Sequence, residues 1–129
     1  MPFVNLESKD ILRGTLIDMG WYLVKIISIG EAPSKDGGST NYPIEGEIIQ
    51  NAETGDTKYA GYPTPPNWNF NSKAIGFVVP FLTALGVEPK PGRVDLGPAQ
   101  GMMIKVYIEH GEYNGRVVNQ INHKYAPAT

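Results

Sequence analysis

The sequence predicts a β-rich fold with one helix, and three features support this prediction. Residues 20–29 form a run rich in aromatic and β-branched residues, the types that are enriched in strands. Two alternating apolar runs are joined by Asn114-Gly115, the pair that supplies the two positive φ angles of a type I′ turn and so indicates a β-hairpin. Between these regions, residues 71–85 carry apolar residues at helical spacing. Strands are therefore expected toward both ends of the chain, with a helix between them.

The first half of the chain is interpreted as a lead-in followed by three strands. Residues 1–19 show no clean period, and we expect at most a short strand around residues 12–17. Gly55 suits the left-handed position of a tight loop, so the strand after it should return antiparallel to the strand before it. In order, we expect a first strand at 20–29, a turn-rich loop at 32–41, a second strand at 42–51 with Ile44, Gly46 and Ile48 on one face, and a third strand at 57–62.

The segment after the third strand cannot continue a central strand, because residues 63–70 contain three prolines, which have no N–H to donate to a ladder. Asn71-Ser72 suits the cap of a helix that runs to Leu85, with Gly86 as its stop. Pro80 predicts a kink in this helix or the start of a second short one. The apolar side of the helix comprises Ile75, Val78, Leu82 and Leu85, and a connector at residues 87–101 leads to the final hairpin.

Strand, strand, strand, helix, strand, strand is the element order of the OB-fold, a partly open Greek-key barrel. The sequence therefore predicts a five-stranded OB-fold barrel with the helix between strands 3 and 4. A β-grasp or another α+β sheet contains similar elements and stays open as an alternative. At 129 residues the chain is expected to be a single domain, 1–129, with 1–19 as a lead-in and 124–129 as a short tail.

The composition argues against several classes of protein. Cysteine is absent and neither C-x-x-C nor H-E-x-x-H occurs, so we expect no metal site and no cofactor. No run reaches the roughly 18 apolar residues of a membrane span, and no signal-peptide pattern is visible, which predicts a cytoplasmic, soluble protein. The net charge is −2, yet residues 31–57 hold six acidic residues against one lysine, whereas residues 58–93 hold four basic residues against one glutamate. Residues 58–93 are a candidate basic patch, with chance clustering of surface charges as the alternative.

Three stretches carry a family resemblance: Gly20-Trp-Tyr-Leu-Val-Lys-Ile26, Pro33-Ser-Lys-Asp-Gly-Gly38, and Gly101 to Ile121 with its Asn114-Gly115 turn. Together they resemble the small OB-fold single-stranded-DNA-binding proteins of bacteriophages, over about residues 20–122. The resemblance implies a non-catalytic, largely sequence-independent DNA-binding role in phage DNA replication or recombination. It implies single-stranded DNA as the ligand, replication or recombination proteins as candidate partners, and the host-cell cytoplasm as the location. The exposed edge of a small barrel predicts a monomer or a homodimer.

Sequence-tolerant binding of single strands needs aromatic faces for the bases and cations for the phosphates. If Tyr22 points into the barrel, alternation turns Trp21 and Lys25 outward, and the same parity turns Lys105 and Tyr107 outward. The third strand and the proline-rich loop after it add aromatic residues that we expect at the surface. The candidate DNA-binding residues are Trp21, Lys25, Lys58, Tyr59, Tyr62, Trp68, Phe70, Lys73, Lys105, Tyr107 and Arg116.

Each candidate also has an ordinary structural interpretation. Trp21 and Trp68 could be core residues, and Lys25, Lys58, Lys105 and Arg116 could be solvated surface charges. For the whole protein, the alternative function is a structural or protein-interaction module, such as a virion or assembly component, which would suit the near-neutral charge and the proline-rich loop. No nucleophile and base stand in a recognisable pattern, so we do not expect an enzyme.

Overall fold

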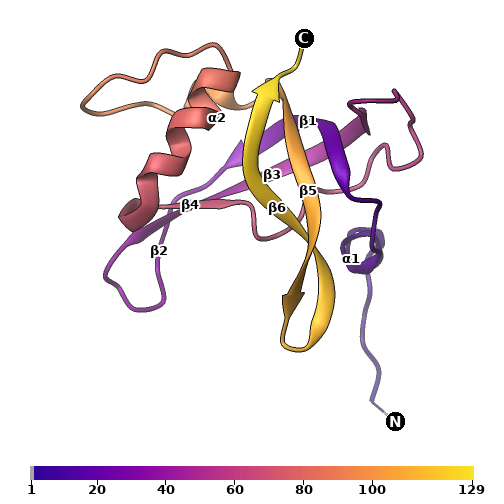
Figure 1. The fold of residues 1–129 in the computed structure, drawn as a ribbon. Coiled ribbons are helices and arrows are strands. Elements are labelled where there is room, and N and C mark those ends of the chain that lie inside the picture. Colours follow the sequence, from indigo (N-terminus) through magenta and orange to yellow (C-terminus); the bar gives the residue numbers. More distant parts are fainter. Residues whose placement is uncertain (1) are drawn as a thin grey trace.

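The computed structural model describes residues 2–129, except for the side chains of residues 9, 10 and 13, and contains an open antiparallel β-sheet with a helix beside it (Figure 1). The expectation of a β-rich fold is confirmed. In chain order the elements are α1 (Ser8–Gly14), β1 (Gly20–Ile29), β2 (Ala32–Pro33), β3 (Thr40–Asn51), β4 (Asn69–Asn71), the 3-10 helix η1 (Ser72–Phe77), α2 (Val78–Ala84), the 3-10 helix η2 (Gly97–Ala99), β5 (Met103–Tyr113) and β6 (Arg116–Pro127). The sheet order is β2-β3-β1-β5-β6, and β4 pairs with β3 outside this path.

The central strand is β1, which occupies the predicted residues and pairs with β3 on one side and β5 on the other. Its alternation is also as predicted, because Tyr22, Val24 and Ile26 are at most 1 % exposed while Lys25 is exposed. The matching inward positions on the neighbouring strands form the rest of this buried face: Ile44, Gly46, Ile48, Ile104, Val106 and Ile108.

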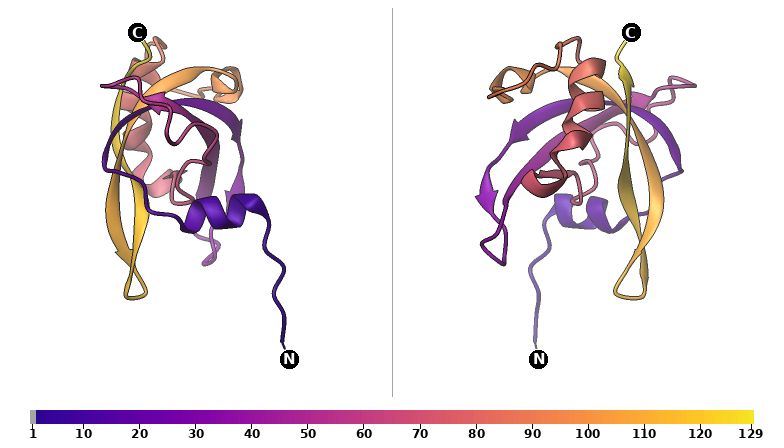
Figure 2. Two further views of the ribbon diagram at one scale, coloured as in Figure 1. Left: turned by 90° about the vertical axis from the view of Figure 1, so that its right-hand side faces the viewer. Right: turned by 60° about the vertical axis from the view of Figure 1, so that its left-hand side comes forward.

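The final hairpin is formed by β5 and β6, and Asn114 and Gly115 have the predicted positive φ angles of 50° and 77°. The pairing of β5 with β1 ends at Ile108, so the rest of the hairpin projects beyond the sheet (Figures 1 and 2). The lead-in docks against it, because the Asn119 side chain accepts a hydrogen bond from the Ile17 N–H and donates one to the Thr15 carbonyl. The short strand expected at residues 12–17 was wrong, since residues 8–14 form α1.

The third strand was also misplaced. Residues 57–62 form turns, in which the Ala60 N–H donates to the Thr57 carbonyl. The chain that pairs with β3 begins only at Gly61 and runs to β4, and it bonds to β3 intermittently. Ile48 exchanges hydrogen bonds with Gly61 and Tyr62, the Thr64 N–H donates to the Gly46 carbonyl, and the Ile44 N–H donates to the Trp68 carbonyl. Prolines are tolerated before β4 because the N–H groups that this segment donates to β3 come from Gly61 and Thr64.

The sheet is open between β4 and β6, so strand pairing does not complete the predicted five-stranded barrel in the described chain. The side chain of Asn67 links these two sides instead. Its Nδ2 donates to the Ile121 carbonyl at 3.3 Å, and its Oδ1 accepts from the Ile121 N–H at 3.0 Å. One amide thus replaces a short stretch of ladder, because it offers a donor and an acceptor side by side as a backbone peptide does.

The predicted helix is present in two parts. Asn71 caps η1 by accepting from the Lys73 N–H, and the helix breaks at Ala74 before α2 begins at Val78. Pro80 lies in the first turn of α2, where an N–H would have no helical partner, and so does not disrupt it. Gly86 ends the helix with φ of 80°, as predicted.

The core lies between the inner face of the sheet, the residues before β4, and α2. Trp68 and Phe70, which we expected at the surface, are 0 % and 1 % exposed, so that expectation was wrong. Both rings pack against Phe81 of α2, and the Trp68 indole N–H donates to the Tyr125 hydroxyl at 2.9 Å. Gly46 makes room for them, because a Cβ there would lie 2.9 Å from the Lys25 carbonyl oxygen and 3.1 Å from the Trp68 ring. Within the described residues, no helix has the length and hydrophobicity to cross a membrane.

Candidate nucleic-acid interface

The outward side chains of β1 and β5 bring together four of the predicted residues. Trp21 lies opposite Tyr107 in the register, and their rings meet edge to face with centroids 5.7 Å apart. Lys105 lies opposite Leu23, and Lys25 extends the row along β1. Both aromatic rings are partly exposed. Residues far apart in the sequence thus form one surface of aromatic rings and cations.

A third lysine joins this surface from β6, and sequence reasoning missed it. The ammonium of Lys124 lies 5.5 Å from the centroid of the Tyr107 ring, within the range of a cation–π contact. Lys124 is placed there by a β-bulge, because the register jumps from Tyr125 opposite Val106 to Asn122 opposite Tyr107. The predicted tail at 124–129 is wrong, because β6 runs to Pro127, and no short-range signal in the sequence marks the bulge. We call the surface formed by Trp21, Leu23, Lys25, Lys105, Tyr107 and Lys124 the outer strip.

The cations of the outer strip are available to an external anion. No salt bridge joins Lys25, Lys105 or Lys124 to a carboxylate in the part of the chain whose side chains are described. Glu47 is the cross-strand neighbour of Lys25, and it marks the boundary with the more acidic β3. The six residues of the outer strip thus include three lysines and no carboxylate, although the whole chain carries −2.

Lys58, Tyr59 and Tyr62 form a separate cluster in the turns after β3. Tyr59 contacts Tyr62 and the inward-facing Tyr22, with centroid separations of 5.4 and 6.2 Å. Lys58 lies 5.2 Å from the Tyr59 ring centroid, and its interaction with the Tyr59 side chain raises the pKa of Lys58. Burial raises the pKa of Tyr22 to about 12, and its hydroxyl donates to the Asp18 carbonyl at 2.6 Å. The cluster covers the inner side of β1 at its first residues, so it does not extend the outer strip.

The remaining candidates lie apart from both groups. Lys73 is at the start of η1, with its ammonium 4.0 Å from a carboxylate oxygen of Asp36. Arg116 is at the tip of the hairpin, and Trp68 and Phe70 are in the core. Lys58 and Lys73 of segment 58–93 therefore lie in different parts of the fold, in the turns after β3 and at the start of η1.

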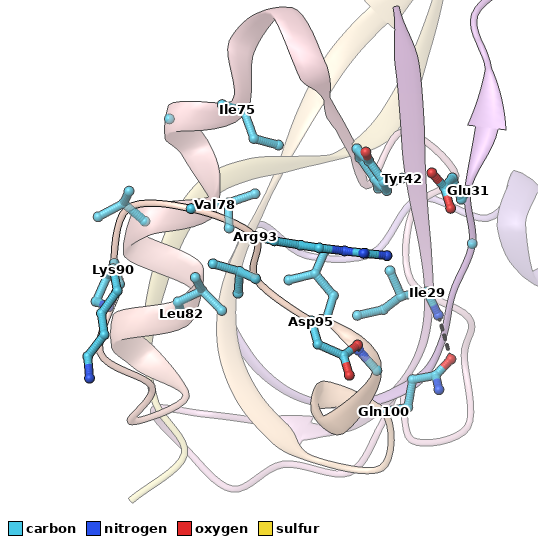
Figure 3. A pocket seen from close by; sticks show the side chains of 18 residues that line it. Ile29, Glu31, Tyr42, Ile75, Val78, Leu82, Lys90, Arg93, Asp95 and Gln100 are labelled. Atoms are coloured by element: carbon cyan, nitrogen blue, oxygen red, sulfur yellow. Dashed lines mark hydrogen bonds between the residues drawn. The ribbon is translucent and has the colours of Figure 1, made fainter.

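A hollow of about 940 Å³ lies on another side of the molecule, between α2, the end of β1, the start of β3 and the connector before β5. Figure 3 shows the Arg93 side chain extended across it, with apolar side chains of α2 nearby and polar side chains such as Asp95 and Gln100 also lining it. The Ile29 N–H donates to the Gln100 side chain at 3.0 Å, which fixes the connector to β1. The wall residues include Ile29, Tyr42, Val78 and Leu82. None of the individually named DNA-binding candidates lines this hollow, but Lys90 and Arg93 of the basic segment 58–93 do.

Within the described residues, no group of three or more His, Cys, Asp or Glu side chains is arranged to hold a metal ion. No protein-family model matches the chain, and a search of curated proteins gives no significant match. The features that bear on function are therefore the geometry of the outer strip and the resemblance of the sequence.

Proposed function

We propose that the protein is a non-catalytic single-stranded-DNA-binding protein that holds the strand on its outer strip. The observation that carries the proposal is the pairing of Trp21 with Tyr107 beside Lys25, Lys105 and Lys124, none of which forms a salt bridge with a described side chain. Aromatic rings stack on bases of any sequence, and lysines neutralise phosphates, so this combination suits binding without sequence preference.

The strand order supports an OB-fold assignment as part of this proposal. If β1, β3, β4, β5 and β6 are numbered as strands 1 to 5, the order is 3-2-1-4-5, and η1 and α2 lie between strands 3 and 4. The Asn67 amide spans the gap between strands 3 and 5. A partly open barrel is within the range of this fold, which binds oligonucleotides on its strand surface and loops. The resemblance to phage proteins extends the proposal to a role in phage DNA replication or recombination.

Each stacked base contributes about 1–3 kcal/mol to binding, so Trp21 and Tyr107 together would supply about 2–6 kcal/mol. The test is titration of a fluorescently labelled oligo-dT at low salt, followed by anisotropy. We expect binding that Trp21→Ala weakens about 5- to 150-fold. Tyr113→Ala, at an exposed position near the tip of the hairpin, serves as the control. Absence of binding by the unaltered protein at low salt would refute the proposal.

The exposed apolar side chains of the N-terminal segment favour a second function, protein interaction. Phe3, Val4 and Leu6 are 88 %, 82 % and 66 % exposed, and such groups of apolar side chains are typical of contact surfaces. A virion or assembly component would use this segment and be indifferent to DNA. Co-sedimentation with a protein assembly that is lost on deletion of residues 2–7, together with no oligo-dT binding, would support this function over the first.

A further inference from the structure

Three aromatic rings form a column that runs from the core to the surface beside the edge of the sheet. Phe70 is buried, and its ring centroid lies 5.3 Å from that of His123 at an interplanar angle of 33°. His123 in turn stacks on Phe77, with centroids 4.9 Å apart at 23°. Phe77 is 51 % exposed. The outermost ring of the column, that of Phe77, is therefore exposed to solvent, and a further flat group could stack on it.

The His123 ring of the column is anchored to the core through Tyr125. The His123 Nδ1 lies 2.7 Å from the Tyr125 hydroxyl, which also accepts the hydrogen bond from the buried Trp68 indole. Phe77 is the cap residue of α2, at its junction with η1. Because His123 is anchored to the core and Phe77 stacks on it, a ligand ring that stacks on Phe77 should cost less side-chain entropy than stacking on an isolated exposed ring.

The β6 bulge connects this column to the outer strip. His123 and Lys124 are adjacent in sequence and have no Cα partners in the β5 register, yet Lys124 contacts Tyr107 whereas His123 contacts Phe77. The strand β6 lies at the end of the sheet order. A chain that passes over this edge beside Lys124 therefore moves from one aromatic surface to the other.

A shallow hollow lies along the same helix and strand, and it shares Tyr125 with the anchor of the column. It has a volume of about 280 Å³, lies between α2 and the end of β6, and is lined by Val79, Pro80, Thr83, Ala84, Tyr125 and Pro127. This volume is near the lower limit of about 300 Å³ for small-molecule pockets, and the lining is mostly apolar. It suits a single flat, weakly polar group such as a base.

We propose that Phe77, stacked on His123, is a second base-stacking site for the same DNA strand, which crosses the edge of β6 beside Lys124. This inference rests on the proposed function. It adds two residues that sequence reasoning did not select, and it predicts that the bound strand is longer than the outer strip alone requires.

The test compares two lengths of oligo-dT, about 4 and about 16 nucleotides, which span the usual site sizes of OB-folds. We expect Phe77→Ala to weaken binding of the longer oligonucleotide about 5- to 150-fold and to change binding of the shorter one less than about twofold. Phe77→Tyr keeps the ring and should retain the affinity of the unaltered protein. Phe3→Ala is the matched control, because it removes an exposed phenylalanine ring elsewhere.

The outcomes separate this inference from the proposed function. Trp21→Ala should weaken both lengths, because the first site is needed for either. Unchanged affinity of Phe77→Ala for the longer oligonucleotide would overturn the second site while the first stands. An equal loss for both lengths would also overturn it, since Phe77 would then belong to the first site. Failure of the unaltered protein to bind either length would refute both.

Discussion

Replacing Lys25, Lys105 and Lys124 together by glutamine removes three charges from the outer strip and leaves the aromatic rings in place. Each lysine that neutralises a phosphate of single-stranded DNA contributes about −0.7 to the slope of log K against log salt. Three such contacts give a slope of about −2. Between 50 and 200 mM salt, this corresponds to a loss of affinity of about 20-fold for the unaltered protein.

The triple variant should lose this part of the salt dependence. The assay is anisotropy of labelled oligo-dT at four or more salt concentrations, with circular dichroism to check the fold. Lys90→Gln, in the connector before β5, is a control that should leave the slope unchanged. If the triple variant keeps the slope of the unaltered protein, the phosphates lie elsewhere and the reasoning fails.

Two further predictions concern the fold. Asn67→Ala removes both hydrogen bonds to Ile121 and should lower the free energy of unfolding by about 1–3 kcal/mol, measured by urea denaturation. Asn5→Ala is the control. An equal loss of stability in both variants would contradict the role of Asn67. Burial lowers the pKa of His123, so the unfolded chain binds more protons than the folded one below the ordinary pKa of about 6.5. The melting temperature should therefore fall as the pH is lowered from 7 to 5, and His123→Gln should reduce this fall. The same fall in His123→Gln as in the unaltered protein would contradict the role of His123.

Local patterns predicted the elements whose structure is set by nearby residues. The run at 20–29 became β1 because its aromatic and β-branched residues suit a pleated surface buried on one face. Asn114-Gly115 became the turn of the final hairpin because few other pairs adopt two positive φ angles. Gly86 ended the helix for the same reason, so the sequence positions of these elements were reliable.

The errors came from long-range packing. Trp68 and Phe70 stand among prolines and asparagines that suggest a surface loop, yet that segment bonds to β3 and places both rings under α2. The same bonding explains why the strand expected at 57–62 formed later in the chain. Lys124 and Phe77 were missed as candidate contacts because their positions depend on a bulge and on a stack with His123, which only the folded chain brings together.

One NMR titration of the unaltered protein with oligo-dT can test whether the outer strip holds the DNA, because the two tryptophans lie in different parts of the fold. The Trp21 indole lies in the outer strip, whereas the Trp68 indole is buried and bonded to Tyr125. We predict that the Trp21 indole N–H resonance shifts in proportion to the fraction of protein bound while the Trp68 resonance stays nearly unchanged. Binding that leaves the Trp21 resonance in place would contradict the claim that the outer strip holds the DNA.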